Sequence, residues 1–234
     1  MFLKNCLIII PAKGTSHRVK SKNTKKINGI PLIKYTFDFI KNLKIEKNCY
    51  VSTDSIKIKK ICKDNKINYI NRPKKLCTKF TSTEKVIFHA LNTLNKSKKY
   101  KWVITLPPTS PLRRRKTFLR CLNYTKNKNI DVITTFSKNY GDFWIIKKNE
   151  AKRLFPRSPR NQHQRDPLFE ENSSMYFNKI SSLEKYKSMI KGRVKTVISE
   201  KYEDIDINNL SDFEDCEYLI KKNNKKNKHY FKSF

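Results

Sequence analysis

The sequence predicts an α/β fold in which helices cover both faces of a doubly wound, mostly parallel sheet. Short apolar runs alternate with amphipathic segments over residues 6–136, as in repeated strand and helix units. The first run, residues 7–11, is uninterrupted, which is typical of a central parallel strand that is buried on both faces. Hydrophobic residues make up 37% of the 234-residue chain, enough for the core of one domain.

The expected elements follow one another in a regular order. Strands are expected at residues 7–11, 50–54, 67–71, 102–106, 131–136, 175–177 and 194–198. The first long helix opens at Pro31, because the start of a helix tolerates proline. Further helices are expected at residues 58–62 and 114–128, and after the capping boxes Thr81–Glu84 and Ser211–Glu214. In such a sheet, ligands bind beyond the carboxyl ends of the strands.

Residues 141–172 interrupt this alternation. Three prolines and four arginines fall between Arg153 and Pro167, which predicts an excursion from the core, either a hairpin or a dimerisation arm. We therefore expect one domain over residues 1–220, with a protruding arm at 141–172. The basic, Asn-rich residues 221–234 are expected to form a mobile tail.

The charge of the chain is strongly unbalanced. It carries 53 Lys and Arg against 20 Asp and Glu, a formal net charge of +33. Such a field attracts polyanions, so a basic nucleic-acid-binding protein is one alternative. The 42 Lys, 23 Asn and 25 Ile have codons rich in A and T, which indicates a coding bias instead. Because the bases are spread along the chain, we expect no specific nucleic-acid partner.

Several function classes lose support from the sequence. No apolar run approaches the roughly 20 residues that span a bilayer, and no signal peptide is recognisable, so we expect a cytoplasmic protein without a membrane partner. The six cysteines lack C-x-x-C spacing and fit reduced, buried thiols. The signatures of P-loop NTPases, dinucleotide oxidoreductases and zincins are absent.

The loop after the first strand is the strongest candidate for a binding site. Its sequence over residues 11–23 is PAKGTSHRVKSKN, which contains no acid. Backbone N–H groups around Gly14 and the hydroxyl of Ser16 can donate hydrogen bonds to a phosphate. The cations that can neutralise a triphosphate are Lys13, Arg18 and Lys22. The alternative is a solvated loop in a Lys-rich protein.

A pair of acids near the C-terminus is the candidate metal site. In a strand, Asp204 and Asp206 would point to the same side, about 7 Å apart, while Ile205 and Ile207 face the other side. Two such carboxylates can hold Mg²⁺ and leave positions for phosphate oxygens. The alternative is a polar strand end whose acids cap a neighbouring helix.

Residues 10–23, IPAKGTSHRVKSKN, resemble the nucleotide-binding signature of the acylneuraminate cytidylyltransferase (CMP-N-acetylneuraminic acid synthetase) family. Further stretches resemble landmarks of that family in the right order over roughly residues 6–220. They are VSTD at 51–54, Arg72-Pro73 with TSTE at 81–84, PTSPLR at 108–113, Glu171-Asn172 with Met175-Tyr176, and DID at 204–206.

The resemblance implies a nucleotide-diphospho-sugar transferase-like, Rossmann-like fold and a nucleotidyltransferase activity. CMP would pass from CTP to a nonulosonic, sialic-acid-like sugar with release of pyrophosphate, for surface glycan biosynthesis. Mg²⁺ is the implied cofactor; it and the basic loop would stabilise charge on the triphosphate, and catalysis would come chiefly from positioning and electrostatics. Family members are typically homodimers in which a protruding segment reaches the partner's sugar site, so residues 141–172 are expected to be that arm.

The resemblance also implies a set of site residues. The catalytic residues would be Lys22, Asp204 and Asp206, with both acids as metal ligands. The nucleotide contacts would be Lys13, Gly14, Ser16, Arg18, Lys22, Asn23, Arg72 and Ser82. The sugar contacts would be Thr109, Ser110, Arg113, Arg165 and Asn172.

This chain departs from the family pattern at four positions. Lys13 replaces the usual Arg and loses its bidentate fork, and His17 replaces a usual Lys. Pro107 replaces a Gln of sialate-specific relatives, and Ser173 follows Asn172 where Gly is frequent. The acceptor therefore stays open among legionaminate-like, pseudaminate-like and ketooctonate-like acids, and another sugar nucleotidyltransferase of this fold is an alternative.

Overall fold

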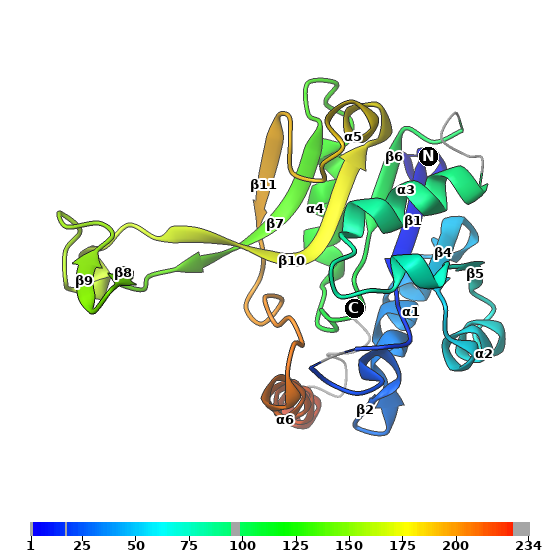
Figure 1. Ribbon diagram of the computed structural model, residues 1–234, viewed down its shortest axis with the longest axis horizontal. Helices are drawn as coiled ribbons and strands as arrows, with labels where there is room; N and C mark the ends of the chain where they lie inside the picture. The colour runs from blue at the N-terminus through cyan, green and yellow to red at the C-terminus, as the bar shows by residue number, and fades with distance from the viewer. Residues whose placement is uncertain (1, 17, 95–98, 227–234) are drawn as a thin grey trace.

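The central strand of the sheet is β1 (Cys6–Pro11), which pairs in parallel with β4 (Cys49–Thr53) and β6 (Trp102–Thr105). The computed structural model describes residues 2–16, 18–94 and 99–226. Seven strands form the main sheet in the order β11-β7-β10-β6-β1-β4-β5 (Figure 1). The remaining strands of this sheet are β5 (Asn68–Asn71), β7 (Val132–Asn139), β10 (Leu168–Lys179) and β11 (Val194–Ile198).

Only β10 runs antiparallel to its neighbours in this sheet, since the other pairs are parallel. The predicted doubly wound, mostly parallel α/β fold is therefore confirmed. β10 is also much longer than the three residues that the sequence indicated, because it continues into the arm.

Alternate residues of β1 face opposite layers of helices, as the uninterrupted apolar run predicts. Ile8 and Ile10 belong to one buried cluster, which includes residues of three helices. These helices are α1 (Leu32–Asn42), α2 (Ile56–Asp64) and α4 (Arg115–Tyr124). Leu7 and Ile9 belong to the opposite cluster. Its helices are α3 (Thr83–Leu94) and α5 (Ile180–Tyr186).

A third buried cluster joins the last helix to the rest of the domain. Phe213, Cys216 and Ile220 of α6 (Leu210–Lys226) pack with residues of α1 and of a small hairpin. This hairpin consists of β2 (Lys26–Ile27) and β3 (Ile30–Pro31). α6 continues through Lys226, so residues 221–226 are helical and not part of a tail. Residues 227–234 of the expected tail lie outside the described residues.

Residues 141–172 leave the core, as the sequence indicated. β7 and β10 extend beyond the sheet as a two-stranded ribbon, and a hairpin at its far end carries β8 (Trp144–Lys147) and β9 (Glu150–Arg153) (Figure 1). The pairing of β10 with β7 shifts register between Glu171 and Tyr176, where the ribbon joins the sheet. We call residues 139–168 the arm.

Both predicted capping boxes lie one or two residues from the real helix starts. The hydroxyl of Ser82, not of Thr81, accepts the N–H of Lys85 at the start of α3. At α6, the side chain of Asn209 accepts the N–H of Asp212, and the carboxylate of Asp212 accepts the N–H of Asn209. α4 ends at Tyr124, four residues before the predicted end. Across the described ranges, no helix is both long and apolar enough to cross a membrane.

Candidate active site

A cavity of about 310 Å³ opens beside the carboxyl ends of β1 and β6. It is lined by Pro11, Lys13, Thr15, Ser16, Arg18, Lys22, Asn23, Lys79, Pro107, Pro108 and Thr109. Pro11 ends β1, the segment after β1 supplies six of these residues, and the loop after β6 supplies three. The sequence-indicated residues that the structure brings together here are Lys13, Ser16, Arg18, Lys22, Asn23 and Thr109.

Positive charge is concentrated around this cavity. Burial lowers the pKa of Lys22; Asp206 opposes this shift, and Arg18 and Lys13 add to it. The ammonium of Lys13 donates to the carbonyl of Thr78 at 3.2 Å, so the loop before α3 is held against the loop after β1. Several cations held close together in a cleft favour an anionic ligand of high charge.

Gly14 lies where this loop passes close to the start of α2. A Cβ atom on Gly14 would lie 2.7 Å from the Cβ of Ser55, so only glycine fits without a shift. The N–H of Gly14 donates to a carboxylate oxygen of Asp54 at 2.8 Å. Because Asp54 accepts this hydrogen bond, the predicted contact of the Gly14 amide with phosphate would require that bond to be exchanged, and it stays a prediction.

Residues 199–209 follow β11 and form turns and irregular backbone, so Asp204 and Asp206 do not lie on a strand. Asp204 is exposed in a turn, whereas Asp206 is half-buried and accepts a hydrogen bond from the amide of Asn208 at 2.7 Å. The prediction that both acids point to one side of a strand is thus wrong. Only Asp206 lies close enough to Lys22 and Arg113 to raise the pKa of both.

Glu203 anchors this irregular segment to α4. Its buried carboxylate accepts three hydrogen bonds of 2.6 Å, from the backbone N–H of Arg114 and of Glu200 and from the hydroxyl of Thr117. Burial raises the pKa of Glu203, and the hydrogen bonds from Thr117, Glu200 and Arg114 act against that shift. Asp206 follows three residues later, so Glu203 helps to fix its position.

Arg113 is 1% exposed, and its guanidinium joins three parts of the fold. It donates to the carbonyl of Ser174 at 2.7 Å, to the hydroxyl of Thr36 at 3.2 Å and to the carbonyl of Pro107. Burial lowers the pKa of Arg113 to about 9, and the nearby carboxylates of Asp206 and Glu203 oppose this shift. The predicted sugar contact does not fit such a buried group, so Arg113 positions the loop after β6.

Two other predicted sugar contacts, Thr109 and Ser110, lie on the same loop but differ in their exposure to the cavity. Ser110 is fully buried, which does not fit the predicted contact with a sugar. Thr109 lines the cavity, and its carbonyl accepts the N–H of Ile207 at 2.8 Å. This bond connects the loop after β6 to the segment that carries Asp206.

The predicted cytidine contacts lie outside the lining of the cavity. Arg72 is buried and donates to the hydroxyl of Ser52 at 3.1 Å and to its carbonyl at 2.7 Å. Burial lowers the pKa of Arg72, which Cys77 and Asp54 oppose. Ser82 is exposed and caps α3. Cytidine recognition by Arg72 and Ser82 stays a prediction. The departure from the family pattern at His17 lies outside the described residues.

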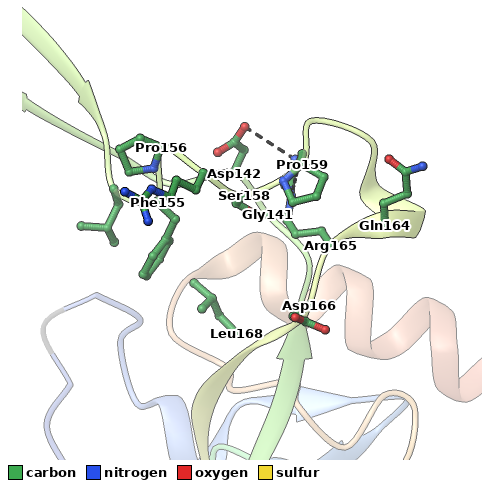
Figure 2. Close-up of a pocket in the computed structure, with 12 residues that line it drawn as sticks. Gly141, Asp142, Phe155, Pro156, Ser158, Pro159, Gln164, Arg165, Asp166 and Leu168 are labelled. Carbon is green, nitrogen blue, oxygen red and sulfur yellow. Dashed lines mark hydrogen bonds and ion pairs between the residues drawn. The ribbon is translucent and has the colours of Figure 1, made fainter.

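A second cavity, of about 670 Å³, lies in the arm and contains Arg165 (Figure 2). The guanidinium of Arg165 donates to the carbonyls of Tyr140, Pro159 and Arg160 at 2.7–2.9 Å and lies 3.6 Å from a carboxylate oxygen of Asp142. The structure therefore does not bring Arg165 together with the cationic cavity of its own chain. Its bonds stabilise the turn of the arm.

Asn172 is buried at the base of the arm, where β10 shifts register. Its side chain accepts the hydroxyl of Thr135 at 2.6 Å and donates to Ser137 and Ser199 at 3.1 and 2.6 Å. A direct sugar contact does not fit this bonding, so Asn172 stabilises the bulge. Ser173 has a left-handed φ of 54°, a conformation that glycine adopts more readily than serine.

Sequence reasoning gave no role to three residues of this region. Asp54 ends the VSTD stretch and could have been found from its position after β4. Glu203 has only its place beside Asp204 as a signal. No sequence pattern distinguishes Lys79 from the other lysines, since the chain has 42 of them. Only the fold shows that it lines the cavity.

Comparisons with known proteins agree with this architecture. Residues 7–232 match the family model described as Cytidylyltransferase. The chain is 25% identical over 229 residues to the post-translational flagellin modification protein B of Campylobacter coli, covering 95% of this chain and 97% of that protein. It is 23% identical over 214 residues to the N-acylneuraminate cytidylyltransferase of Streptococcus agalactiae serotype III, covering 88% of this chain and 51% of that protein.

Solved structures show the same fold at lower identity. A CMP:2-keto-3-deoxy-manno-octonic acid synthetase complexed with CTP aligns with a TM-score of 0.67 and 15% identity, covering 93% of this chain and 99% of the other. A 4-diphosphocytidyl-2C-methyl-D-erythritol synthase from Anaerococcus prevotii aligns with a TM-score of 0.67 and 16% identity, covering 94% and 99%. At such identities, the similarity establishes the fold.

Proposed function

The chain belongs to the cytidylyltransferase family, and on this premise we propose that it transfers CMP from CTP to a nonulosonic, sialic-acid-like sugar and releases pyrophosphate. The family membership supports the general reaction, which is transfer of a cytidylyl group to a sugar or a related substrate. The observation that carries the proposal is the cationic cavity at the ends of β1 and β6. Its charge suits both a triphosphate and an acidic acceptor.

The proposed reaction is an in-line displacement at the α-phosphorus of CTP. The anomeric hydroxyl oxygen of the sugar forms the new bond to phosphorus, the bond from phosphorus to the bridging oxygen breaks, and pyrophosphate leaves. The hydroxyl proton passes to water or to the sugar carboxylate. Lys13, Arg18 and Lys22 stabilise the negative charge of the triphosphate and of the leaving group.

Mg²⁺ is part of the proposal. Mg²⁺ is usually bound by one or two carboxylates together with substrate phosphates, and the half-buried carboxylate of Asp206 fits that role. Asp204 is exposed, and the described residues contain no group of three or more potential metal ligands, so substrate oxygens would complete the coordination. When bound, the ion would neutralise charge on the triphosphate.

The names of relatives support an acidic acceptor sugar without selecting one. One relative is an N-acylneuraminate cytidylyltransferase. A 3-deoxy-manno-octulosonate cytidylyltransferase of Rickettsia canadensis is 26% identical over 133 residues, covering 56% of this chain and 52% of that protein. The second candidate function is therefore transfer of CMP to a ketooctonic acid.

We also propose that the protein is a homodimer whose arm packs against the partner. The arm and its base expose six large apolar side chains, of which Ile146 is 73% exposed. They are Trp144, Ile145, Ile146, Leu154, Phe155 and Phe169. Exposed apolar residues gathered on one protrusion are typical of an interaction surface.

The decisive experiment measures pyrophosphate release by the purified protein with CTP, Mg²⁺ and a panel of nonulosonic and ketooctonic acids. We expect turnover with a nonulosonic acid and poor replacement of CTP by ATP or GTP. Turnover only with a ketooctonic acid would select the second candidate. No turnover with any acid, together with tight, salt-sensitive DNA binding, would contradict the enzyme proposal. Sedimentation of wild-type protein and of Ile146→Asp tests the dimer.

A further inference from the structure

Phe80 is an exposed aromatic residue on the loop between β5 and α3. Its side chain is 83% exposed, equal to that of Ile56 and higher than that of the other exposed large hydrophobic residues in the described ranges. A lone exposed apolar residue is ordinary on a protein surface. Phe80 differs from such a residue because it directly follows Lys79, which lines the candidate active site.

The neighbour of Phe80 connects it to the cationic cavity. Lys79 lines the cavity, and its ammonium lies 4.9 Å from the centroid of the Phe80 ring. The loop is held in this place at both ends. Lys13 donates to the carbonyl of Thr78, and Ser82 caps α3. Phe80 therefore directly follows a residue that lines the cavity, and its ring lies beside the ammonium of that residue.

We propose that Lys79 and Phe80 together bind the nucleotide, with Lys79 on the triphosphate and Phe80 stacked on the cytosine base. This inference rests on the proposed function. A cation above an aromatic ring occupies the face on which a base would stack. When the ammonium of Lys79 turns to the phosphates, that face becomes available, and every base offers a π-face to an aromatic side chain.

The two residues are thereby coupled through one ring face. Binding of the triphosphate by Lys79 would move its ammonium off one face of the ring, and a base stacked on that face would prevent the ammonium from returning. Because stacking tolerates any base, Phe80 adds affinity for nucleotides without choosing cytosine. The choice of base is left to groups that reach its polar edge.

The test compares two ligands, CTP and inorganic triphosphate, by calorimetry on the full chain. We expect Phe80→Ala to weaken CTP binding about tenfold and to leave the affinity for inorganic triphosphate unchanged, because the latter has no base. Lys79→Ala should weaken the binding of both ligands. Lys185 and Tyr186 of α5 form a matched pair, with a cation 5.0 Å from the ring centroid, at the opposite edge of the sheet.

Lys185→Ala and Tyr186→Ala should leave both affinities at the wild-type value. Unchanged CTP affinity in Phe80→Ala would overturn the inference alone, because wild-type CTP binding would still support the proposed function. Equal weakening of both ligands in Phe80→Ala would overturn it as well, since that result indicates a distorted loop. Failure of the wild-type protein to bind CTP would contradict the proposed function and this inference together.

Discussion

The ammonium of Lys22 donates a 2.7 Å hydrogen bond to the carbonyl of Ile207, a residue 185 positions away in the sequence. The N–H of Ile207 in turn donates to the carbonyl of Thr109. Three segments that line or adjoin the cavity are therefore joined at one residue. A lysine placed to bind the triphosphate also holds the backbone next to Asp206, so phosphate binding and the position of this acid are linked.

Replacing Lys22 should damage CTP use more than replacing a neighbouring lysine. Lys22→Ala removes a cation from the cavity and the bond to Ile207, and a hydrogen bond to a charged group contributes about 1.5–3 kcal/mol. We expect kcat/KM for CTP to fall roughly 10- to 100-fold. Lys20 is exposed on the same loop, and Lys20→Ala should stay close to wild type in the same steady-state assay. Equal losses would mean that overall charge governs the affinity.

The activity should also fall at high pH because of Lys22. Burial lowers the pKa of its ammonium below the usual 10.5, so the charged form is lost as the pH rises through that lowered value. We expect kcat/KM for CTP to decrease on the alkaline side below pH 10.5. Lys22→Arg keeps its charge to higher pH and should move the decrease upward. If wild type and Lys22→Arg lose activity over the same alkaline range, the decrease arises from the titration of another group.

Asp206 and Asp204 should differ in their effect on turnover. Asp206 is half-buried beside Lys22 and Arg113, whereas Asp204 is exposed in a turn. Asp206→Asn should lower kcat at saturating CTP and Mg²⁺ about a hundredfold or more, because charge neutralisation at a phosphoryl group contributes several kcal/mol. Asp204→Asn should retain most of the rate. Similar losses of kcat in both variants would instead support a metal site formed by both carboxylates.

Glu203 should contribute strongly to stability. Glu203→Ala leaves two backbone N–H groups and the Thr117 hydroxyl without their acceptor, and each unsatisfied buried group costs about 1–3 kcal/mol. We expect a clear fall in the free energy of unfolding in urea. Glu200 forms a surface ion pair with Lys116 at 3.0 Å, so Glu200→Gln should cost about 1 kcal/mol or less. A comparable effect of the two changes would contradict the anchoring role.

The sheet and its helices could be predicted because each element carries a local pattern. The apolar run of β1 is buried on both faces, as an uninterrupted run indicates. The arm could be predicted from its prolines and arginines, since these break the alternation. The loop after β1 could be located because a basic, glycine-containing stretch follows directly on a strand.

The roles of single residues were harder to predict because they depend on distant partners. The sequence around Arg113 indicates a substrate-binding arginine. In the structure, however, its guanidinium donates hydrogen bonds to Ser174, Thr36 and Pro107 inside the protein. Asp204 and Asp206 fit a strand by spacing alone. The buried bonds of Glu203 instead hold this segment in a turn, which no local pattern indicates.

Gly14→Ala should impair the site through a steric contact with Ser55. The new Cβ would lie 2.7 Å from the Cβ of Ser55, which caps α2 by accepting the N–H of Ile58. Overpacking of this kind costs about 1–3 kcal/mol, and the displaced loop should use CTP less well. Urea unfolding and kcat/KM for CTP measure the two effects.

The double change Gly14→Ala with Ser55→Gly identifies the cause. Removing the Ser55 side chain takes away the contact, and glycine at a helix N-cap costs only a few tenths of a kcal/mol. The double variant should therefore recover part of the stability and of the CTP use that Gly14→Ala loses. If it is no better than the single variant, the loss arises from elsewhere, such as a weakened bond between the N–H of residue 14 and Asp54.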